Sequence, residues 1–163
     1  MSHTLHITTV QSELVWENID QNLRHFSEKI EPLRGKTDVI ILPEMFTTGF
    51  TMQPQQVAES TNGKAVEWLD KKARQLQCAI TGSFVCEENG QYFNRLVWAT
   101  PNADPVYYDK KHLFTLAGEH KHYQPGSKKV IVEWKGWKIC PLICYDLRFP
   151  VWLRNRGDYD LLL

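Results

Sequence analysis

The first candidate for chemistry in this chain is Cys144, which lies where an apolar run gives way to a polar segment. The apolar run, residues 139–143, predicts a strand, and the residues after Cys144 are compatible with a helix. A cysteine at such a turn faces the positive end of a helix, which favours the nucleophilic thiolate over the thiol. The alternative is a structural cysteine, because isolated cysteines are commonly small core residues.

Glu44 and a pair of lysines lie in two other segments that read as strands. Glu44 follows the apolar run 39–42, which is typical of a strand buried on both faces of a parallel sheet, and ligands bind at the carboxyl edge of such a sheet. Lys110 and Lys111 follow an aromatic pair, and strand alternation places them on opposite faces without saying which one points inward. A carboxylate, a lysine and a cysteine supply the base, the cation and the nucleophile for acyl transfer.

Three segments of the chain resemble the glutamate, lysine and cysteine motifs of the nitrilase superfamily, the carbon-nitrogen hydrolases. They are, in the family's order, Pro43-Glu44-Met45-Phe46, Tyr108-Asp109-Lys110-Lys111-His112-Leu113-Phe114 and Cys144-Tyr145-Asp146-Leu147-Arg148-Phe149-Pro150. These segments are most similar to the omega-amidase branch and its bacterial members. One such motif is weak evidence, whereas three in order across most of the chain are strong evidence.

The resemblance implies a role for each of the charged residues. In the family pattern one residue separates the catalytic lysine from His-Leu-Phe, which selects Lys110 and leaves Lys111 as a surface neighbour. Glu44 accepts the thiol proton while the sulfur of Cys144 attacks the amide carbonyl, and Lys110 donates to the oxyanion. A second family glutamate precedes a Pro-Gly turn, and Glu119 stands in that relation here. Without the resemblance, Glu119 reads as a solvated loop carboxylate.

Three further residues complete the implied site. The backbone N–H of Tyr145 is the second oxyanion donor. Arg148 lies four residues after Cys144, so in a helix the two share a face, and the resemblance implies that Arg148 binds the distal carboxylate of the substrate. The alternative for Arg148 is an ion pair with Asp146 or another acid. We expect Phe46 to form a wall of the substrate pocket, although core packing explains it equally well.

The omega-amidase branch acts on short dicarboxylic monoamides such as 2-oxoglutaramate and 2-oxosuccinamate. The resemblance therefore implies hydrolysis of these amides to the 2-oxo acid and ammonia through a cysteine thioester, with no cofactor and in a homodimer. Two other interpretations stay open. One is a deaminated-glutathione amidase or another carbon-nitrogen hydrolase, and the other is a truncated domain that serves as an interaction module or is inert.

Composition argues against several other classes of protein. The formal net charge is +0 and the isoelectric point is near 7.0, so nothing favours binding to nucleic acid or to an anionic membrane. No apolar run approaches the roughly 20 residues of a membrane span, and the polar N-terminus has no signal-peptide pattern. We therefore expect a cytoplasmic protein, and the resemblance implies that its partner is a small-molecule amide.

The cysteines and histidines leave a metal site as a minor alternative. Four cysteines are too few for a disulfide framework in a chain of 163 residues, and Cys78 and Cys140 read as core residues. A zinc cluster would draw on Cys140, Cys144, His112, His120 and His122. No paired C-x-x-C arrangement is present and the His-x-His lies in an apparently irregular stretch, so we expect no metal.

The hydrophobic pattern predicts an α/β fold made of one domain, residues 1–163. Strands are expected at residues 5–10 and 39–42, helices at 16–30 and 64–76, a loop at 47–62, and hairpins at 79–86 with 92–99 and at 130–134 with 137–143. This order resembles the first part of the α-β-β-α sandwich of the nitrilase superfamily. The ending Asp158-Tyr159-Asp160-Leu161-Leu162-Leu163 lacks turn or capping residues, so we expect a fragment whose C-terminal part is absent. A true short form is the alternative.

Overall fold

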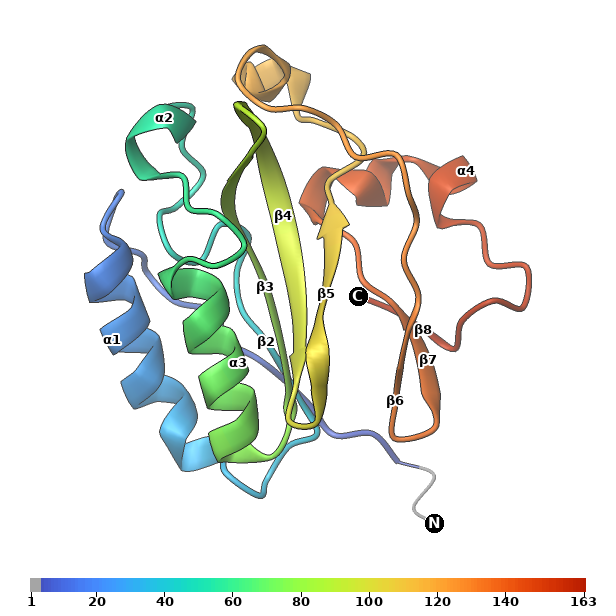
Figure 1. The fold of residues 1–163 in the computed structure, drawn as a ribbon. Coiled ribbons are helices and arrows are strands. Elements are labelled where there is room, and N and C mark those ends of the chain that lie inside the picture. Colours follow the sequence, from blue (N-terminus) through green and yellow to red (C-terminus); the bar gives the residue numbers. More distant parts are fainter. Residues whose placement is uncertain (1–3) are drawn as a thin grey trace.

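A five-stranded sheet forms the centre of the fold in the computed structural model, which describes residues 4–163 (Figure 1). Its strands, in spatial order, are β1 (Ile7–Thr9), β2 (Val39–Ile41), β3 (Ala79–Glu88), β4 (Gln91–Thr100) and β5 (Ala103–Asp109). The first three strands are parallel to each other, whereas β3, β4 and β5 pair antiparallel. The carboxyl ends of β2 and β3 therefore lie together at one edge, where ligands commonly bind.

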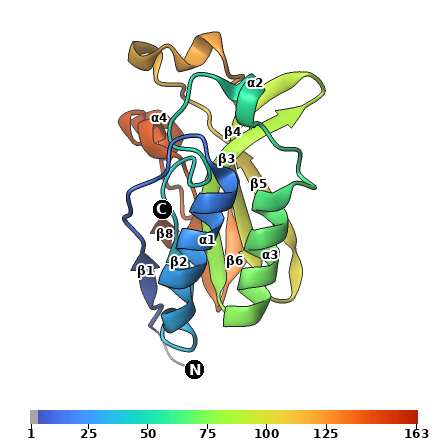
Figure 2. The ribbon, with the colours of Figure 1, turned by 90° about the vertical axis from the view of Figure 1, so that its left-hand side faces the viewer.

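Two amphipathic helices, α1 (Ile19–Ile30) and α3 (Lys64–Leu76), cover one face of this sheet (Figures 1 and 2). Their apolar stripes follow helical spacing and are buried against the sheet, as expected for helices that face a core. The buried apolar side chains are Leu23, Phe26 and Ile30 of α1 and Ala65, Val66, Leu69, Ala73 and Leu76 of α3.

A second sheet packs against the other face of the first (Figure 1). It contains β6 (Val132–Trp134), β7 (Trp137–Cys140) and β8 (Leu161–Leu162), with β6 antiparallel and β8 parallel to β7. An apolar cluster of Val39, Ala79, Trp98, Val132 and Ile139 fills the space between the sheets. Helices, first sheet and second sheet are three successive layers of the predicted α-β-β-α sandwich.

The remaining elements are short and connect these layers. They are the helices α2 (Pro54–Val57) and α4 (Pro150–Leu153) and the 3₁₀ turns η1 (Glu31–Leu33), η2 (Thr115–Ala117), η3 (Glu119–Lys121) and η4 (Cys144–Arg148). Within residues 4–163, no helix has both the length and the apolar character needed to cross a membrane.

Most element predictions agree with the structure, and the differences have local causes. The predicted helix 64–76 and the turn at Asn89-Gly90 are confirmed, with both turn residues in the left-handed region that this kind of hairpin requires. The predicted helix 16–30 begins only at Ile19, because Glu17 is left-handed and the Asn18 side chain caps the helix. Helix α2 lies inside the predicted loop 47–62, and the second hairpin is shorter than predicted.

Candidate active site

Glu44 lies just beyond β2, in a turn that the neighbouring strand holds in place. The Leu42 N–H donates to the carbonyl of Thr81 at 2.8 Å, which continues the pairing of β2 with β3. The Met45 N–H then donates to Ser83 Oγ at 2.9 Å, and Met45 itself adopts a left-handed φ of 48°. These contacts turn the chain immediately after the strand, so the Glu44 side chain projects from the carboxyl edge of the sheet.

Lys110 is held by backbone contacts on both sides at the end of β5. Its N–H donates to the carbonyl of Asn94 at 3.0 Å, and its carbonyl accepts from the N–H of Gly126 at 2.8 Å. Gly126 is required there, because a Cβ on it would lie 2.1 Å from the carbonyl oxygen of Asp109. Strand alternation extends one residue past the end of β5, because Tyr108 and Lys110 are both buried whereas Asp109 between them is partly exposed.

The side chains of Glu44, Lys110 and Glu119 form a charge network, as the resemblance implied. Lys110 Nζ lies 2.7 Å from Glu44 Oε1 and 2.9 Å from Glu119 Oε2. The side chains of Lys110 and Glu119 are fully buried, so Glu119 is not a solvated loop carboxylate. Burial by itself lowers the pKa of Lys110, but the two carboxylates outweigh it and the pKa is raised. Lys110 therefore remains a cation at neutral pH.

Asn94 also belongs to this network, and the sequence analysis did not identify it. Its Nδ2 donates to Glu44 Oε1 at 2.8 Å and to Glu119 Oε1 at 3.2 Å. Its only sequence signal is that asparagine is disfavoured in strands, whereas Asn94 lies within the buried part of β4. The backbone of Phe114 also contacts Glu119, because its N–H donates to Oε2 at 2.6 Å.

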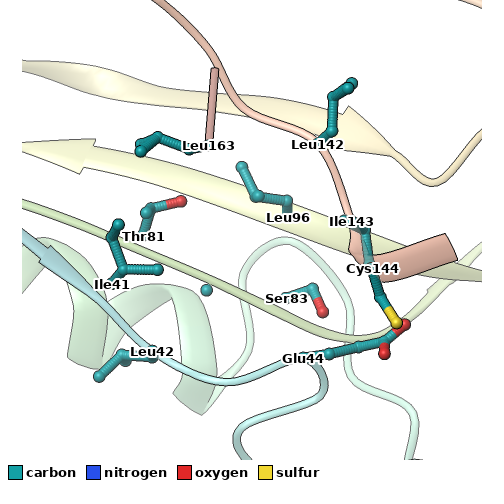
Figure 3. A pocket seen from close by; sticks show the side chains of 11 residues that line it. Ile41, Leu42, Glu44, Thr81, Ser83, Leu96, Leu142, Ile143, Cys144 and Leu163 are labelled. Carbon is teal, nitrogen blue, oxygen red and sulfur yellow. The ribbon is translucent and has the colours of Figure 1, made fainter. Parts of the chain in front are cut away.

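Cys144 begins the 3₁₀ turn η4, and its thiol faces the Glu44 carboxylate across the gap between the two sheets (Figure 3). Its φ is 42°, a left-handed value that costs energy in a residue with a Cβ. Among the four free cysteines it is the exposed one, whereas Cys78, Cys86 and Cys140 are buried. The core assignment of Cys78 and Cys140 is thus confirmed, and the structural alternative for Cys144 does not fit its exposure.

The predicted preference for thiolate at Cys144 is wrong. Partial burial and the negative charge of Glu44 raise the pKa of the thiol to about 11, and the opposing effect of Lys110 is smaller. The expected helix is a 3₁₀ turn of five residues, which carries little of the dipole of a long helix. At neutral pH the sulfur is protonated and needs a base.

Asp146 anchors the turn that carries Cys144, a role that the sequence analysis also missed. It is fully buried, and its carboxylate accepts from Tyr108 Oη at 2.6 Å, from the Ile143 N–H at 3.2 Å and from the His112 N–H at 2.9 Å. The Nδ1 of His112 lies 2.8 Å from the same carboxylate, and the His112 ring stacks on Phe149 at 3.7 Å. These contacts fix the backbone on both sides of the nucleophile.

Tyr145 and Arg148 are the two other predicted residues in this turn. No hydrogen-bond acceptor for the Tyr145 N–H occurs among residues 4–163, which leaves that donor available to a ligand. Arg148 is exposed, and because residues three apart align in a 3₁₀ helix, Leu147 rather than Arg148 shares a face with Cys144. The helical argument for Arg148 is therefore wrong, and so is the alternative ion pair with Asp146, whose partners lie elsewhere.

Phe46 lies in the core rather than on a pocket wall. It is fully buried, and its ring packs against Phe26 at 5.7 Å and Trp68 at 5.8 Å on the helix side of the sheet. These contacts favour the core-packing alternative. An aromatic ring that does approach the charged groups is Phe50, whose centroid lies 5.1 Å from Lys110 Nζ.

A cavity of about 250 Å³ opens beside Cys144 and Glu44 (Figure 3). Its walls are mostly apolar and include Ile41 and Leu96 from the first sheet. Thr81 also lines this cavity. Its Oγ1 is buried and has no hydrogen-bond partner among the described residues. A small ligand in this cavity would contact both the thiol and the carboxylate.

Histidines do not converge with cysteines or acids into a metal cluster in the described part of the chain. His112 contacts Asp146 and Phe149, whereas His120 and His122 are exposed in and after η3.

The chain is similar to known amidases over nearly its whole length. The profile of a family described as Carbon-nitrogen hydrolase matches residues 6–161. The protein named Omega-amidase YafV of Escherichia coli (strain K12) is 47% identical over 98% of this chain, and the 2-oxoglutaramate amidase of Bacillus subtilis (strain 168) is 32% identical over 91%. The chain spans 61% and 59% of the lengths of these two relatives.

Solved structures agree with these relatives. XC1258 from Xanthomonas campestris, described as a CN-hydrolase superfamily protein with an arsenic adduct in its active site, superposes with a TM-score of 0.96 at 44% identity. The match covers 99% of this chain and 64% of that one. The Nit3 protein of Saccharomyces cerevisiae, at 23% identity and a TM-score of 0.84, shares the fold. The predicted fold class is confirmed.

Proposed function

This chain belongs to the carbon-nitrogen hydrolase family, and from that premise we propose that it acts as an omega-amidase. The substrates are short dicarboxylic 2-oxo acid monoamides, 2-oxoglutaramate and 2-oxosuccinamate, and the products are the 2-oxo acid and ammonia. The observation that carries this proposal is the meeting of a thiol, a carboxylate and a buried ammonium: Cys144 faces Glu44, and Lys110 Nζ lies 2.7 Å from Glu44 Oε1. The names of relatives at 47% and 32% identity support the substrate class.

The proposed reaction begins with the protonated thiol. The carboxylate of Glu44 takes the proton from Cys144 while the sulfur bonds to the amide carbon. This proton transfer is needed because the pKa of the thiol is about 11. The carbonyl oxygen then becomes an oxyanion. Lys110 Nζ and the N–H of Tyr145 stabilise it, and each donor of this kind is typically worth about 100-fold to 1,000-fold in rate.

The second half of the reaction returns the proton and releases the acid. Protonated Glu44 gives its proton to the departing nitrogen, the carbon–nitrogen bond breaks, and ammonia leaves a thioester on Cys144. Glu44 then takes a proton from water as the water oxygen attacks the thioester carbon. When the carbon–sulfur bond breaks, the sulfur regains that proton and the carboxylic acid departs. Every step is proton transfer or acyl transfer, so these residues suffice without a cofactor.

The name of one relative, a 2-oxoglutaramate amidase, favours a short substrate over deaminated glutathione. The cavity of about 250 Å³ shares Leu142, Cys144 and Leu163 with a second cavity of about 220 Å³, so together they give room for a ligand beside the thiol. A substrate-binding role for Arg148 stays a prediction that rests on the resemblance alone. The homodimer and the cytoplasmic location also stay predictions.

The test is ammonia release from 2-oxoglutaramate by the 163-residue chain, run beside Cys144→Ala. We expect release by the parent chain and none by the variant. Deaminated glutathione in place of 2-oxoglutaramate tests the neighbouring activity, and faster release from it would overturn the substrate assignment. A folded parent chain that releases ammonia from neither compound would instead favour the interaction-module alternative.

A further inference from the structure

Asn94 is a neutral amide buried between the two carboxylates of the charge network. Its side chain is inaccessible to solvent, and its Nδ2 donates to Oε1 of both Glu44 and Glu119, at 2.8 and 3.2 Å. Its Oδ1 is also buried and has no hydrogen-bond partner among the described residues. An unpaired buried acceptor is costly, so this amide is explained by what its N–H groups do rather than by packing.

The hydrogen bonds of Glu44 distinguish its two oxygens. Oε1 accepts from both Lys110 Nζ and Asn94 Nδ2, and neither of these donors binds Oε2. A carboxylate with two fixed donors on one oxygen cannot rotate freely about its terminal bond. The position of the other oxygen is then fixed as well, and the sulfur of Cys144 lies beside this carboxylate (Figure 3).

We propose that Asn94 is a positioning residue that fixes the Glu44 carboxylate so that Oε2 is the atom that accepts the Cys144 proton. The backbone of Asn94 contributes as well, because its carbonyl accepts the Lys110 N–H at 3.0 Å. One residue of β4 thus orients the base with its side chain and the oxyanion donor with its backbone. This inference rests on the proposed amidase chemistry.

The neutrality of the amide matters as much as its geometry. Two carboxylates share one lysine, so the network already holds one more negative charge than positive. A donor at Asn94 binds both carboxylates without adding a second cation to the network. An apolar side chain of the same size would remove both hydrogen bonds and leave the Glu44 carboxylate free to turn.

The test compares Asn94→Leu with Asn22→Leu, a matched change at another buried asparagine. The Asn22 amide is fully buried, and its hydrogen bonds within residues 4–163 are with backbone groups of Val15 and Thr47. In ammonia release, we expect Asn94→Leu to lower kcat about tenfold or more with KM within about twofold. The acidic limb of its pH profile should move up by about one unit, because a hydrogen bond to a charged group is worth roughly one to two pKa units.

Asn22→Leu should lower the midpoint of thermal unfolding but leave the acidic limb where it is in the parent. If both variants move the limb equally, or if a folded Asn94→Leu does not move it, the inference is wrong. Asn94→Asp, which keeps the shape but replaces the donor with a third carboxylate, should move the limb further. It also carries the test if Asn94→Leu does not fold.

Alkylation of Cys144 by iodoacetamide separates this inference from the proposed function, since it needs no substrate. The rate should show an inflection at the pH where Glu44 ionises, because that charge raises the pKa of the thiol. We expect Asn94→Leu to shift the inflection up by about one unit, as in the kinetic profile. If the inflection moves but the parent releases no ammonia, only the proposed function fails. If ammonia is released but the inflection stays in place, only the inference fails.

Discussion

The two sides of the candidate site are built in opposite ways. The side that comes from the five-stranded sheet holds charges that are buried and joined by hydrogen bonds, as in the pair Lys110 and Glu119. The side that comes from the second sheet holds an exposed thiol on a left-handed backbone, with Cys144 at a φ of 42°. The first side is fixed by contacts of side chains, and the second by the turn beneath the nucleophile, which Asp146 anchors.

This difference follows from what each group has to do. A buried charge without partners is costly, so a base and a cation inside the protein require donors and acceptors around them. A neutral thiol carries no such cost, and it must be reached by substrate and then bonded to it. Rigidity is therefore placed in the side chains on one side of the site and in the backbone on the other.

The largest expected effect comes from removing the cation, in Lys110→Met. This change leaves Glu44 and Glu119 buried without their shared cation, so we expect a loss of about 3 to 5 kcal/mol in the free energy of unfolding. Ammonia release should fall by about 1,000-fold or more, because the oxyanion also loses a donor. Urea denaturation and initial rates measure the two effects.

Lys111→Met is the matched control for that prediction. Lys111 is the adjacent residue and contacts the Trp152 ring at 5.8 Å rather than the carboxylates. We expect its free energy of unfolding and its activity to stay close to those of the parent. Equal effects at the two positions would contradict the assignment of Lys110.

The next largest effect is expected from Asp146→Asn, which tests the turn that carries Cys144. An amide NH₂ would face one of the donors that now bind this carboxylate, from Tyr108, Ile143 and His112. We expect kcat to fall about 30-fold and the free energy of unfolding to fall by about 2 to 3 kcal/mol. The exposed Asp158→Asn is the control, and unchanged kcat in a folded Asp146→Asn would show that the turn does not need this anchor.

The same contrast explains how much of the site the sequence could predict. Glu44, Lys110 and Cys144 lie in local motifs, so their neighbours in sequence identify them. Asn94 lies 50 residues from Glu44, and only the order of the sheet, in which β3 lies between β2 and β4, brings the two together. That contact depends on strand register over long separations, which one sequence does not reveal.

The length of an element also limits what the sequence predicts, as α3 and the turn at Cys144 show. The apolar stripe of α3 extends over 13 residues, enough to define its period and therefore its bounds. The turn after Cys144 has five residues, and such a short segment does not distinguish a 3₁₀ turn from an α-helix. The predictions of a shared helix face for Arg148 and of a thiolate at Cys144 depended on that distinction, and both failed. The choice of Cys144 as the nucleophile did not depend on it.

A smaller effect is expected from Glu44→Gln, which tests the electrostatic coupling between the Glu44 carboxylate and the Cys144 thiol. Because the Glu44 charge raises the pKa of the Cys144 thiol, its removal should lower that pKa and increase the thiolate fraction. We expect alkylation by iodoacetamide at pH 8 to become about threefold faster for each unit by which the thiol pKa falls, because the tenfold gain in thiolate is partly offset by its lower nucleophilicity. Hydrolysis should slow because its base is gone. Slower alkylation would contradict the coupling.

Labelling stoichiometry is the control for the alkylation measurement. Burial raises the pKa of Cys78 and of Cys86 to about 11, and neither thiol is exposed. In the folded protein we therefore expect one labelled thiol by mass spectrometry, and four after unfolding. More than one label in the folded state would mean that the measured rate does not report Cys144 alone.

The smallest expected effect isolates the backbone strain at the nucleophile, by comparing Cys144→Gly with Cys144→Ala. Both variants lack the sulfur, but glycine adopts a φ of 42° without the steric cost that a Cβ imposes. We expect the glycine variant to be the more stable by about 1 kcal/mol in urea denaturation. At Cys140, which lies in β7 outside the left-handed region, the same pair should show the opposite order, because glycine weakens a strand. If alanine is the more stable residue at both positions, the left-handed turn at Cys144 is not strained, and the contrast between a nucleophile held by its backbone and charges held by their side chains loses its energetic basis.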